Sequence, residues 1–201
     1  MASVEQCIAF APTHVSTYAL TYEERTPFWS QRADAVDDDI ALDQYRHAIA
    51  TLGAGGYVHY EVSNFARPGH ESAHNLIYWR NEEYAGFGPG AVGYLGGVRM
   101  RNLSNIARYL ERPGKKEESL RLSERETKVE TLIQHFRTRA GIRREEYHRR
   151  FAATTDEDFK GPLKELVSRG LLNDDDDRHA PTPLGYALTN EIGPPPVAPP
   201  G

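Results

Sequence analysis

The chain has 201 residues, of which 39% are hydrophobic and 26% are charged, and its formal net charge is −5. This length can bury the core of one large domain or two small ones, and the negative charge provides no overall basic field for nucleic acid or anionic lipid. No apolar run approaches the roughly 18 residues of a transmembrane segment, and no signal peptide opens the sequence. We therefore expect a cytoplasmic protein without nucleic-acid partners.

Cys7 is the only cysteine in the sequence. One thiol cannot form an internal disulfide, and it cannot supply the three or four ligands of an iron–sulfur cluster. A single cysteine also suits a reducing compartment.

The first half of the chain alternates between helical and extended patterns. Residues Val4–Phe10 resemble the end of a helix, and Val15–Tyr22 is β-branched and aromatic, as in a strand. Residues Asp38–Leu52 carry one apolar stripe at helical spacing, and Tyr57–Val62 is the next predicted strand. This order predicts an α/β fold with parallel strands. Two or three strands cannot close a barrel, so the segment is expected to be part of a larger sheet.

The second half is mainly helical. Ser123 and Glu126 have the spacing of a capping box at the start of the first helix, and Gly170 is placed to end the third. A hairpin and a closing helix follow, which gives a winged-helix-like plan. The predicted elements are helices from Glu124, over Arg144–Phe151 and over Glu157–Arg169, a hairpin over residues 171–182 and a helix over Pro183–Ile192.

Two changes in composition suggest the domain boundaries. Residues 112–116 (RPGKK) are polar and rich in helix breakers, as in a linker, and residues 193–201 are mostly proline and glycine, as in a disordered tail. We therefore predict one domain over residues 1–111 and a second over residues 118–192.

A winged-helix plan raises the possibility of DNA binding, but the charges oppose it. The predicted recognition helix mixes Lys160 and Lys164 with Asp158 and Glu165, and the wing is the acidic run Asp174–Asp177. Phosphate would be repelled by that wing, so a structural or docking role is favoured.

Residues 74–79 read HNLIYW, a combination that composition and spacing leave undecided between a functional site and a packed turn. His70 and His74 would share a helical face, but Pro68-Gly69 and the lack of an apolar period favour a loop. Residues 86–91 (GFGPGA) lack the lysine of a phosphate loop, and their glycines suit a close approach to a flat ligand or to another strand.

The order of several motifs is more specific than any one of them. The chain contains HVSTYALTYEERTPFW (residues 14–29), GYVHYEVSNFARPGHESAHNLIYWR (residues 56–80) and YAGFGPGAVGY (residues 84–94), and its helical part ends in TPLGYALTNEI (residues 182–192). Over residues 4–192 the sequence resembles the second half of the coproporphyrinogen-dehydrogenase-like radical SAM family. The HNxxYW pattern is most similar to the haem-chaperone branch, the HemW type.

The resemblance implies the fold and the cofactors. The expected fold is α/β, the C-terminal part of a partial (β/α) radical SAM barrel followed by a small, mainly helical winged-helix-like domain. The family carries a [4Fe–4S] cluster in a CxxxCxxC loop and binds S-adenosylmethionine (SAM). Neither that loop nor the family's earlier SAM-binding strand is in this sequence, so the chain resembles the later part of a longer family protein and is not expected to perform radical chemistry by itself.

The resemblance also implies candidate site residues. His74 matches the family's candidate ligand of the haem iron, and Asn75, Tyr78 and Trp79 match residues that orient it or flank the porphyrin. Core packing is the alternative role for Trp79. Ala19 and Val92 match places where the dehydrogenase branch contacts SAM. Many related sequences carry histidine at the position of Val92, so any role of that histidine is lost here.

Three functions follow as hypotheses. The first is a haem chaperone that binds haem or porphyrin and passes haem to an acceptor protein. The second is an oxygen-independent coproporphyrinogen III oxidase, in which HNLIYW shapes the floor of the substrate pocket. The third is a non-catalytic interaction module built on the helical domain.

Overall fold

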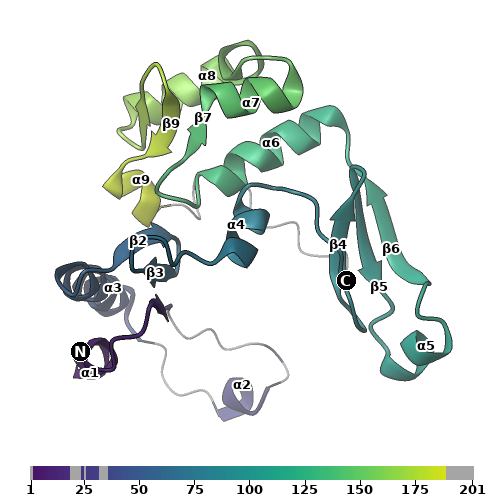
Figure 1. Cartoon of the computed structure of the whole chain (residues 1–201), viewed down its shortest axis with the longest axis horizontal. Coiled ribbons are helices and arrows are strands. Elements are labelled where there is room, and N and C mark those ends of the chain that lie inside the picture. The colour runs from purple at the N-terminus through teal and green to yellow at the C-terminus, as the bar shows by residue number, and fades with distance from the viewer. Residues whose placement is uncertain (1, 19–23, 25, 32–35, 189–201) are drawn as a thin grey trace. The chain divides into compact units, whose positions relative to one another are not determined.

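The computed structural model describes residues 2–18, 24, 26–31 and 36–188. The chain divides between Ser72 and Ala73 into two compact units, and each is described here by itself (Figure 1). Within the described residues, no helix combines the length and the apolar character needed to cross a membrane. The proline-rich tail predicted at residues 193–201 lies outside the described residues.

The first unit is a small three-stranded sheet covered by helices. Leu52, Tyr57 and Phe65 form its buried centre, and apolar side chains from the first and third helices pack around them. Asp37 caps the third helix by accepting a hydrogen bond from the backbone N–H of Asp39. The elements are α1 (Ala2–Ala9), β1 (His14–Ser16), α2 (Pro27–Gln31), α3 (Asp38–Ala54), β2 (Val58–Glu61) and β3 (Asn64–Ala66).

The sheet of the first unit has the order β1–β3–β2, and both of its pairings are antiparallel. The prediction of parallel neighbours is therefore wrong for the described strands. The physical reason is a tight turn at Val62-Ser63, which brings Asn64 back opposite Glu61 and inserts the three-residue strand β3 between β1 and β2. The two predicted strands do run in the same direction, because each is antiparallel to β3. Part of the predicted strand Val15–Tyr22 lies outside the described residues.

The second unit begins with α4 (Ala73–Trp79), which is followed by the antiparallel sheet β4–β5–β6. Gly96 and Gly97, with φ of +57° and +72°, form the two-residue turn between Leu95 and Val98, a conformation that favours glycine. Within the predicted linker, residues 112–115 form the turn between a helix and a strand of this unit, and Lys116 begins that strand. The elements are β4 (Val92–Leu95), β5 (Val98–Asn102), α5 (Ile106–Glu111) and β6 (Lys116–Arg121).

The remainder of the second unit has the predicted winged-helix-like order. Three helices enclose a core that contains Leu132, Tyr147 and Phe159, and the strands form a sheet of order β7–β9–β8. Both predicted ends are present: Ser123 and Glu126 form the capping box, and Gly170 ends its helix with φ of +70°. The elements are α6 (Glu124–His135), β7 (Ile142–Arg143), α7 (Arg144–Phe151), α8 (Thr155–Ser168), β8 (Leu172–Asp174), β9 (Arg178–Pro181) and α9 (Pro183–Ala187).

Two of the four aspartates in the acidic wing form ion pairs with arginines at the start of α7. Arg144 contacts Asp174 and Asp156, and Arg143 contacts Asp177 at 3.0 Å. Beneath the wing, His179 is fully buried, with Nε2 2.8 Å from the Thr155 hydroxyl oxygen and Nδ1 3.1 Å from Asp174. Burial lowers the pKa of His179, Arg144 lowers it further, and the nearby carboxylates, led by Asp174, act in the opposite direction.

This lowered pKa predicts a pH-dependent stability. The unfolded chain takes up a proton at His179 near the ordinary pKa of about 6.5, whereas the folded chain takes it up only at lower pH. We therefore expect the free energy of unfolding to be highest above about pH 6.5 and to fall as the pH decreases below that value. Urea unfolding measured at a series of pH values tests this. His179→Gln should flatten that part of the profile, and the exposed control His148→Gln should not; equal slopes in the two variants would contradict the assignment.

Candidate functional site

The residues of the HNLIYW motif lie on α4, a helix of seven residues, so the predicted loop is wrong. The helix ends at Trp79, and Asn81 closes the turn that follows, with a left-handed φ of +50° and a backbone N–H that donates to the Tyr78 carbonyl. The Asn81 side chain is buried and donates to the Thr131 hydroxyl on α6 at 3.1 Å. Side chains from elsewhere in the second unit therefore define where this helix stops.

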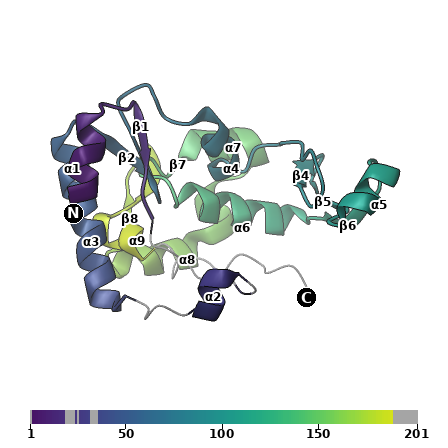
Figure 2. The same cartoon turned by 90° about the horizontal axis from the view of Figure 1, so that it is seen from below.

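Arg150 of α7 fixes the same helix end. Its guanidinium donates to the carbonyl oxygens of Arg80 and Asn81, at 2.8 Å for the first of them. Free carbonyls at the C-terminal end of a helix carry partial negative charge, so a cation is favoured there. The motif helix is thus held on α6 and α7, and it lies beside α6 in both views (Figures 1 and 2).

The helix divides the motif residues between two faces. His74 and Tyr78 are four residues apart, and their rings make an edge-to-face contact with centroids 4.9 Å apart. Both side chains are exposed, and Tyr78 contacts Tyr84 in turn, with ring centroids 4.6 Å apart. His74, Tyr78 and Tyr84 therefore form a continuous aromatic row that begins at an exposed imidazole.

Asn75 and Trp79 lie about 100° around the helix from that row. The guanidinium of Arg137, in the turn that follows α6, stands 5.7 Å from the centre of the Trp79 ring. The indole Nε1 is buried and has no hydrogen-bond partner within the described part of the chain. Both side chains are partly buried. The four predicted residues share one helix, but only His74 and Tyr78 lie side by side in ring contact.

Tyr84 is a residue that the sequence argument did not single out. It forms an isolated β-bridge with Tyr94, and burial raises the pKa of its phenol, an effect that Arg99 opposes. Arg99 makes a two-pronged ion pair with Glu130 of α6, with nitrogen–oxygen distances of 3.1 and 2.7 Å. The only sequence signal for a role of Tyr84 was its position as the first residue of the block YAGFGPGAVGY.

Val92 is the first residue of β4 and is partly buried. The glycine-rich segment before it lies close to this strand, since a Cβ on Gly86 would come within 2.4 Å of the Val92 carbonyl oxygen. The Asn102 side chain binds the carbonyls of Gly86 and Gly88, and the Gly88 N–H donates to the Tyr109 hydroxyl. Close packing beside a strand, one of the two expected roles of the glycines, is therefore observed. Ala19, the other predicted SAM contact, lies outside the described residues.

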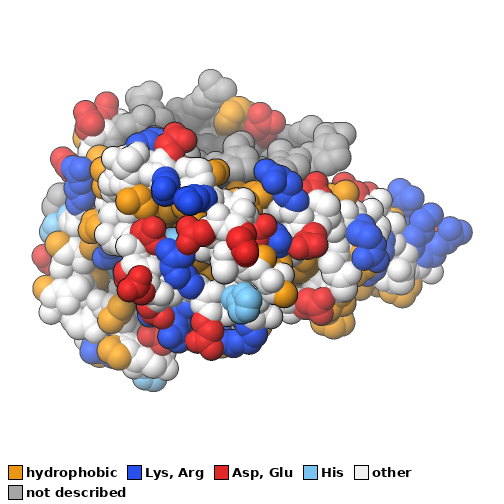
Figure 3. Space-filling view, turned by 90° about the horizontal axis from the view of Figure 1, so that it is seen from above, with side chains coloured by type: hydrophobic (Ala, Val, Ile, Leu, Met, Phe, Trp, Pro, Cys, Tyr) orange, Lys and Arg blue, Asp and Glu red, His pale blue; other side chains and the backbone are white. Residues whose placement is uncertain are grey.

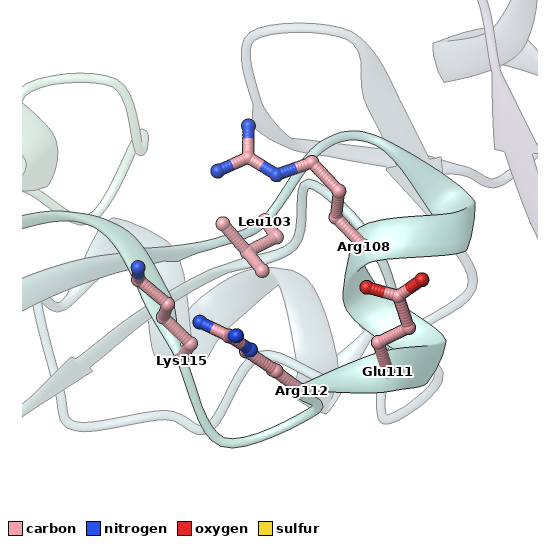
Figure 4. Close-up of a pocket in the computed structure, with 5 residues that line it drawn as sticks. All are labelled: Leu103, Arg108, Glu111, Arg112 and Lys115. Carbon is pink, nitrogen blue, oxygen red and sulfur yellow. The ribbon is translucent and has the colours of Figure 1, made fainter.

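The donor groups differ in how well they fit the implied cofactors. An exposed imidazole such as that of His74 is a suitable axial ligand for haem iron. A [4Fe–4S] cluster requires several thiolates, and this chain has only Cys7, so its residues do not fit that group. Within the described residues, no group of three or more His, Cys, Asp or Glu side chains is arranged to hold a metal ion. A cavity lies near α5, and none of the predicted site residues lines it (Figure 4).

Comparison with known proteins identifies the relatives. The family described as HemN C-terminal domain matches residues 122–188. The heme chaperone HemW of Lactococcus lactis is 33% identical over 195 residues, covering 94% of this chain and 52% of that protein, and HemW of Bacillus subtilis is 30% identical over 198 residues with the same coverage. The chain thus spans about half the length of these relatives.

A solved structure confirms the fold. Coproporphyrinogen III oxidase (HemN) from Escherichia coli, described as a radical SAM enzyme, matches 95% of this chain and 49% of its own with a TM-score of 0.75 and 19% identity. At 19% identity, this match is evidence for a shared fold and is not evidence for a shared activity. The mixed α/β architecture and the helical C-terminal domain are thus confirmed. The chain is thus similar to the C-terminal part of HemW-type proteins of the HemN-like radical SAM family.

Proposed function

We propose that this chain forms the haem-contacting part of a HemW-type haem chaperone, with His74 as the axial ligand of the haem iron. Relatives named heme chaperone HemW in several bacteria support this assignment. The observation that carries the proposal is the exposed His74 imidazole, whose ring lies edge-to-face against Tyr78 with ring centroids 4.9 Å apart. The C-terminal end of the same helix is fixed by contacts with α6 and α7.

The arrangement gives each motif residue a role in that proposal. The neutral imidazole of His74 supplies a nitrogen lone pair to iron. Tyr78 restricts the rotation of that ring and adds an aromatic surface beside it. Asn75 orients the haem from the neighbouring face of the helix, and Trp79, which contacts Arg137 in the turn after α6, supports the helix from behind.

The remaining assignments concern the intact protein. Val92 and Ala19 contact SAM in this proposal, and the cluster is bound by residues that this chain does not contain. An acceptor protein receives the haem.

Titration of the chain with haem tests the ligand assignment. We expect a shifted Soret band for the unaltered chain and, for His74→Ala, an affinity lower by at least about tenfold, the equivalent of 1.4 kcal/mol. Tyr78→Ala should weaken binding less, by roughly threefold, because it removes the support of the ligand and not the ligand itself.

The controls are His70→Ala and His148→Ala, which remove exposed histidines outside α4. Both should bind haem like the unaltered chain. The assignment is wrong if the unaltered chain shows no Soret shift, or if His74→Ala and the two controls behave alike.

A further inference from the structure

A cavity of about 200 Å³ lies beside α5, at the turn that leads into β6 (Figure 4). Leu103 is buried and lines it together with four exposed, charged residues. Three of these are cations from one short stretch of chain, and the fourth is a carboxylate. The charged residues are Arg108, Glu111, Arg112 and Lys115.

The backbone holds the three cations together. The Asn105 side chain caps α5 by accepting a hydrogen bond from the Arg108 N–H at 3.0 Å, and the Arg112 N–H donates to the Arg108 carbonyl at 3.1 Å. The Lys115 N–H then donates to the Arg112 carbonyl at 3.0 Å. Arg112 is the C-cap residue of α5, four residues after Arg108, and the two like charges at this end of the helix repel each other.

No ion pair within the described residues offsets this repulsion: none of the three cations has a carboxylate within 4.0 Å. Glu117 is near enough to Arg108 for the two charges to interact, but it accepts hydrogen bonds from the backbone N–H and the hydroxyl of Ser104. Figure 3 shows Lys and Arg side chains gathered at the end of the molecule that carries β6 and the turn after α5. In a chain of net charge −5, such a local cluster of unpaired cations is a distinct feature.

The charge balance of the cavity indicates its ligand. Three cations and the Glu111 carboxylate give a local charge of +2. A carboxylate ligand would leave one positive charge uncompensated, whereas a phosphate group carries close to two negative charges at neutral pH and presents three acceptor oxygens. Guanidinium groups suit these oxygens geometrically. Exposed Glu117 and Glu118 on β6 oppose a longer polyanion such as nucleic acid.

We propose that this cavity binds one phosphate group, through Arg108, Arg112 and Lys115, while Glu111 accepts a hydrogen bond from a hydroxyl of the ligand. The phosphate belongs either to a small water-soluble phosphate monoester or to a lipid headgroup. The site is independent of α4 and of the proposed haem contact, because none of the HNLIYW residues lines it.

The test is a titration of the whole chain with inorganic phosphate and with glycerol 3-phosphate, followed by NMR of the backbone amides. We expect shifts centred on residues 103–116 and binding at least tenfold weaker in the double variant Arg108→Gln/Arg112→Gln. The matched control is Lys160→Gln/Lys164→Gln, which removes the same charge at the same spacing from the exposed face of α8 and should leave binding unchanged. Equal loss in both double variants would overturn the proposal, since it would indicate a general charge effect.

Two further measurements sharpen the result. Glu111→Gln should strengthen binding of inorganic phosphate several-fold, because it removes the only negative charge that lines the cavity. Phosphate binding should strengthen between about pH 5 and pH 7.5, as the dianion forms, while binding of sulfate should not. Absence of both effects would overturn the charge-balance argument.

Vesicles distinguish the two sources of phosphate. Binding to vesicles that contain phosphatidic acid, lost in the arginine double variant and retained in the lysine control, supports a lipid headgroup. Binding of glycerol 3-phosphate without vesicle binding supports a soluble monoester. Failure of inorganic phosphate, glycerol 3-phosphate and these vesicles to bind would overturn the proposal.

Discussion

Gly141→Ala is expected to unfold the winged-helix-like part of the chain. Gly141 has φ of +62°, and a Cβ added there would lie 1.9 Å from the His179 carbonyl oxygen and 2.6 Å from the Ala180 Cα. These atoms belong to the backbone of β9, which pairs with β7 immediately after Gly141, so no side chain can move aside. We expect a loss of more than about 4 kcal/mol, a large fraction of the stability of a typical domain.

Urea unfolding followed by circular dichroism measures this loss. Gly161→Ala is the matched control, since a Cβ at that position within α8 meets nothing within 4 Å. That variant should be stabilised by up to about 1 kcal/mol, because alanine is the better helix former. A loss below about 1 kcal/mol for Gly141→Ala would show that β7 and β9 separate easily, contrary to the structure.

Tyr147→Ala should produce the second largest effect. The Tyr147 side chain is fully buried between Phe151 and Phe159, with ring centroids 4.8 and 6.4 Å away, and its hydroxyl donates to Asp158 at 2.7 Å. Removal of the ring leaves a cavity and takes one hydrogen bond from Asp158, which keeps its ion pair with Lys128, and we expect a loss of about 3–5 kcal/mol.

Tyr147→Phe separates these two contributions. It keeps the ring and removes only the hydrogen bond to the Asp158 carboxylate, so a loss of about 1.5–3 kcal/mol is expected. Phe87→Ala, at a side chain that is 87% exposed in the same unit, is the control and should change stability by less than about 0.5 kcal/mol. Equal losses for Tyr147→Ala and Tyr147→Phe would contradict the packing role of the ring.

Elements with local signals were predicted well from the sequence. The winged-helix-like order follows from helical apolar periods, from the cap at Ser123 and from the glycine at position 170, all of which act within one or two turns. Val167 is an exception within this part of the chain, since it is an apolar helical residue that is 37% exposed. The helix that carries it has a non-helical Phe159, with φ of −140°, and contains Pro162, so its faces do not follow one regular period.

The errors occur where distant contacts determine the local structure. Strand β3 has only three residues, too few to produce a pattern of its own, and its insertion reverses the expected pairing. Helix α4 buries no residue completely, so it lacks the apolar stripe that identifies a helix, and it is held by Thr131 and Arg150, which lie far along the chain. The assignment of its residues to haem stays a prediction that came from the resemblance alone.

The anchoring of α4 by α6 and α7 has a practical consequence for transplanting the motif into other proteins. The six-residue motif HNLIYW cannot be expected to keep its structure when it is moved alone. The orientation of His74 depends on α4, and the carbonyls that follow α4 are bound by Arg150, which lies 69 and 70 residues further along the chain. A division of the gene at residues 112–117 would remove these supports from the motif. Residues 73–188, expressed as one piece, keep the histidine together with its scaffold and are the natural unit to graft or to recombine.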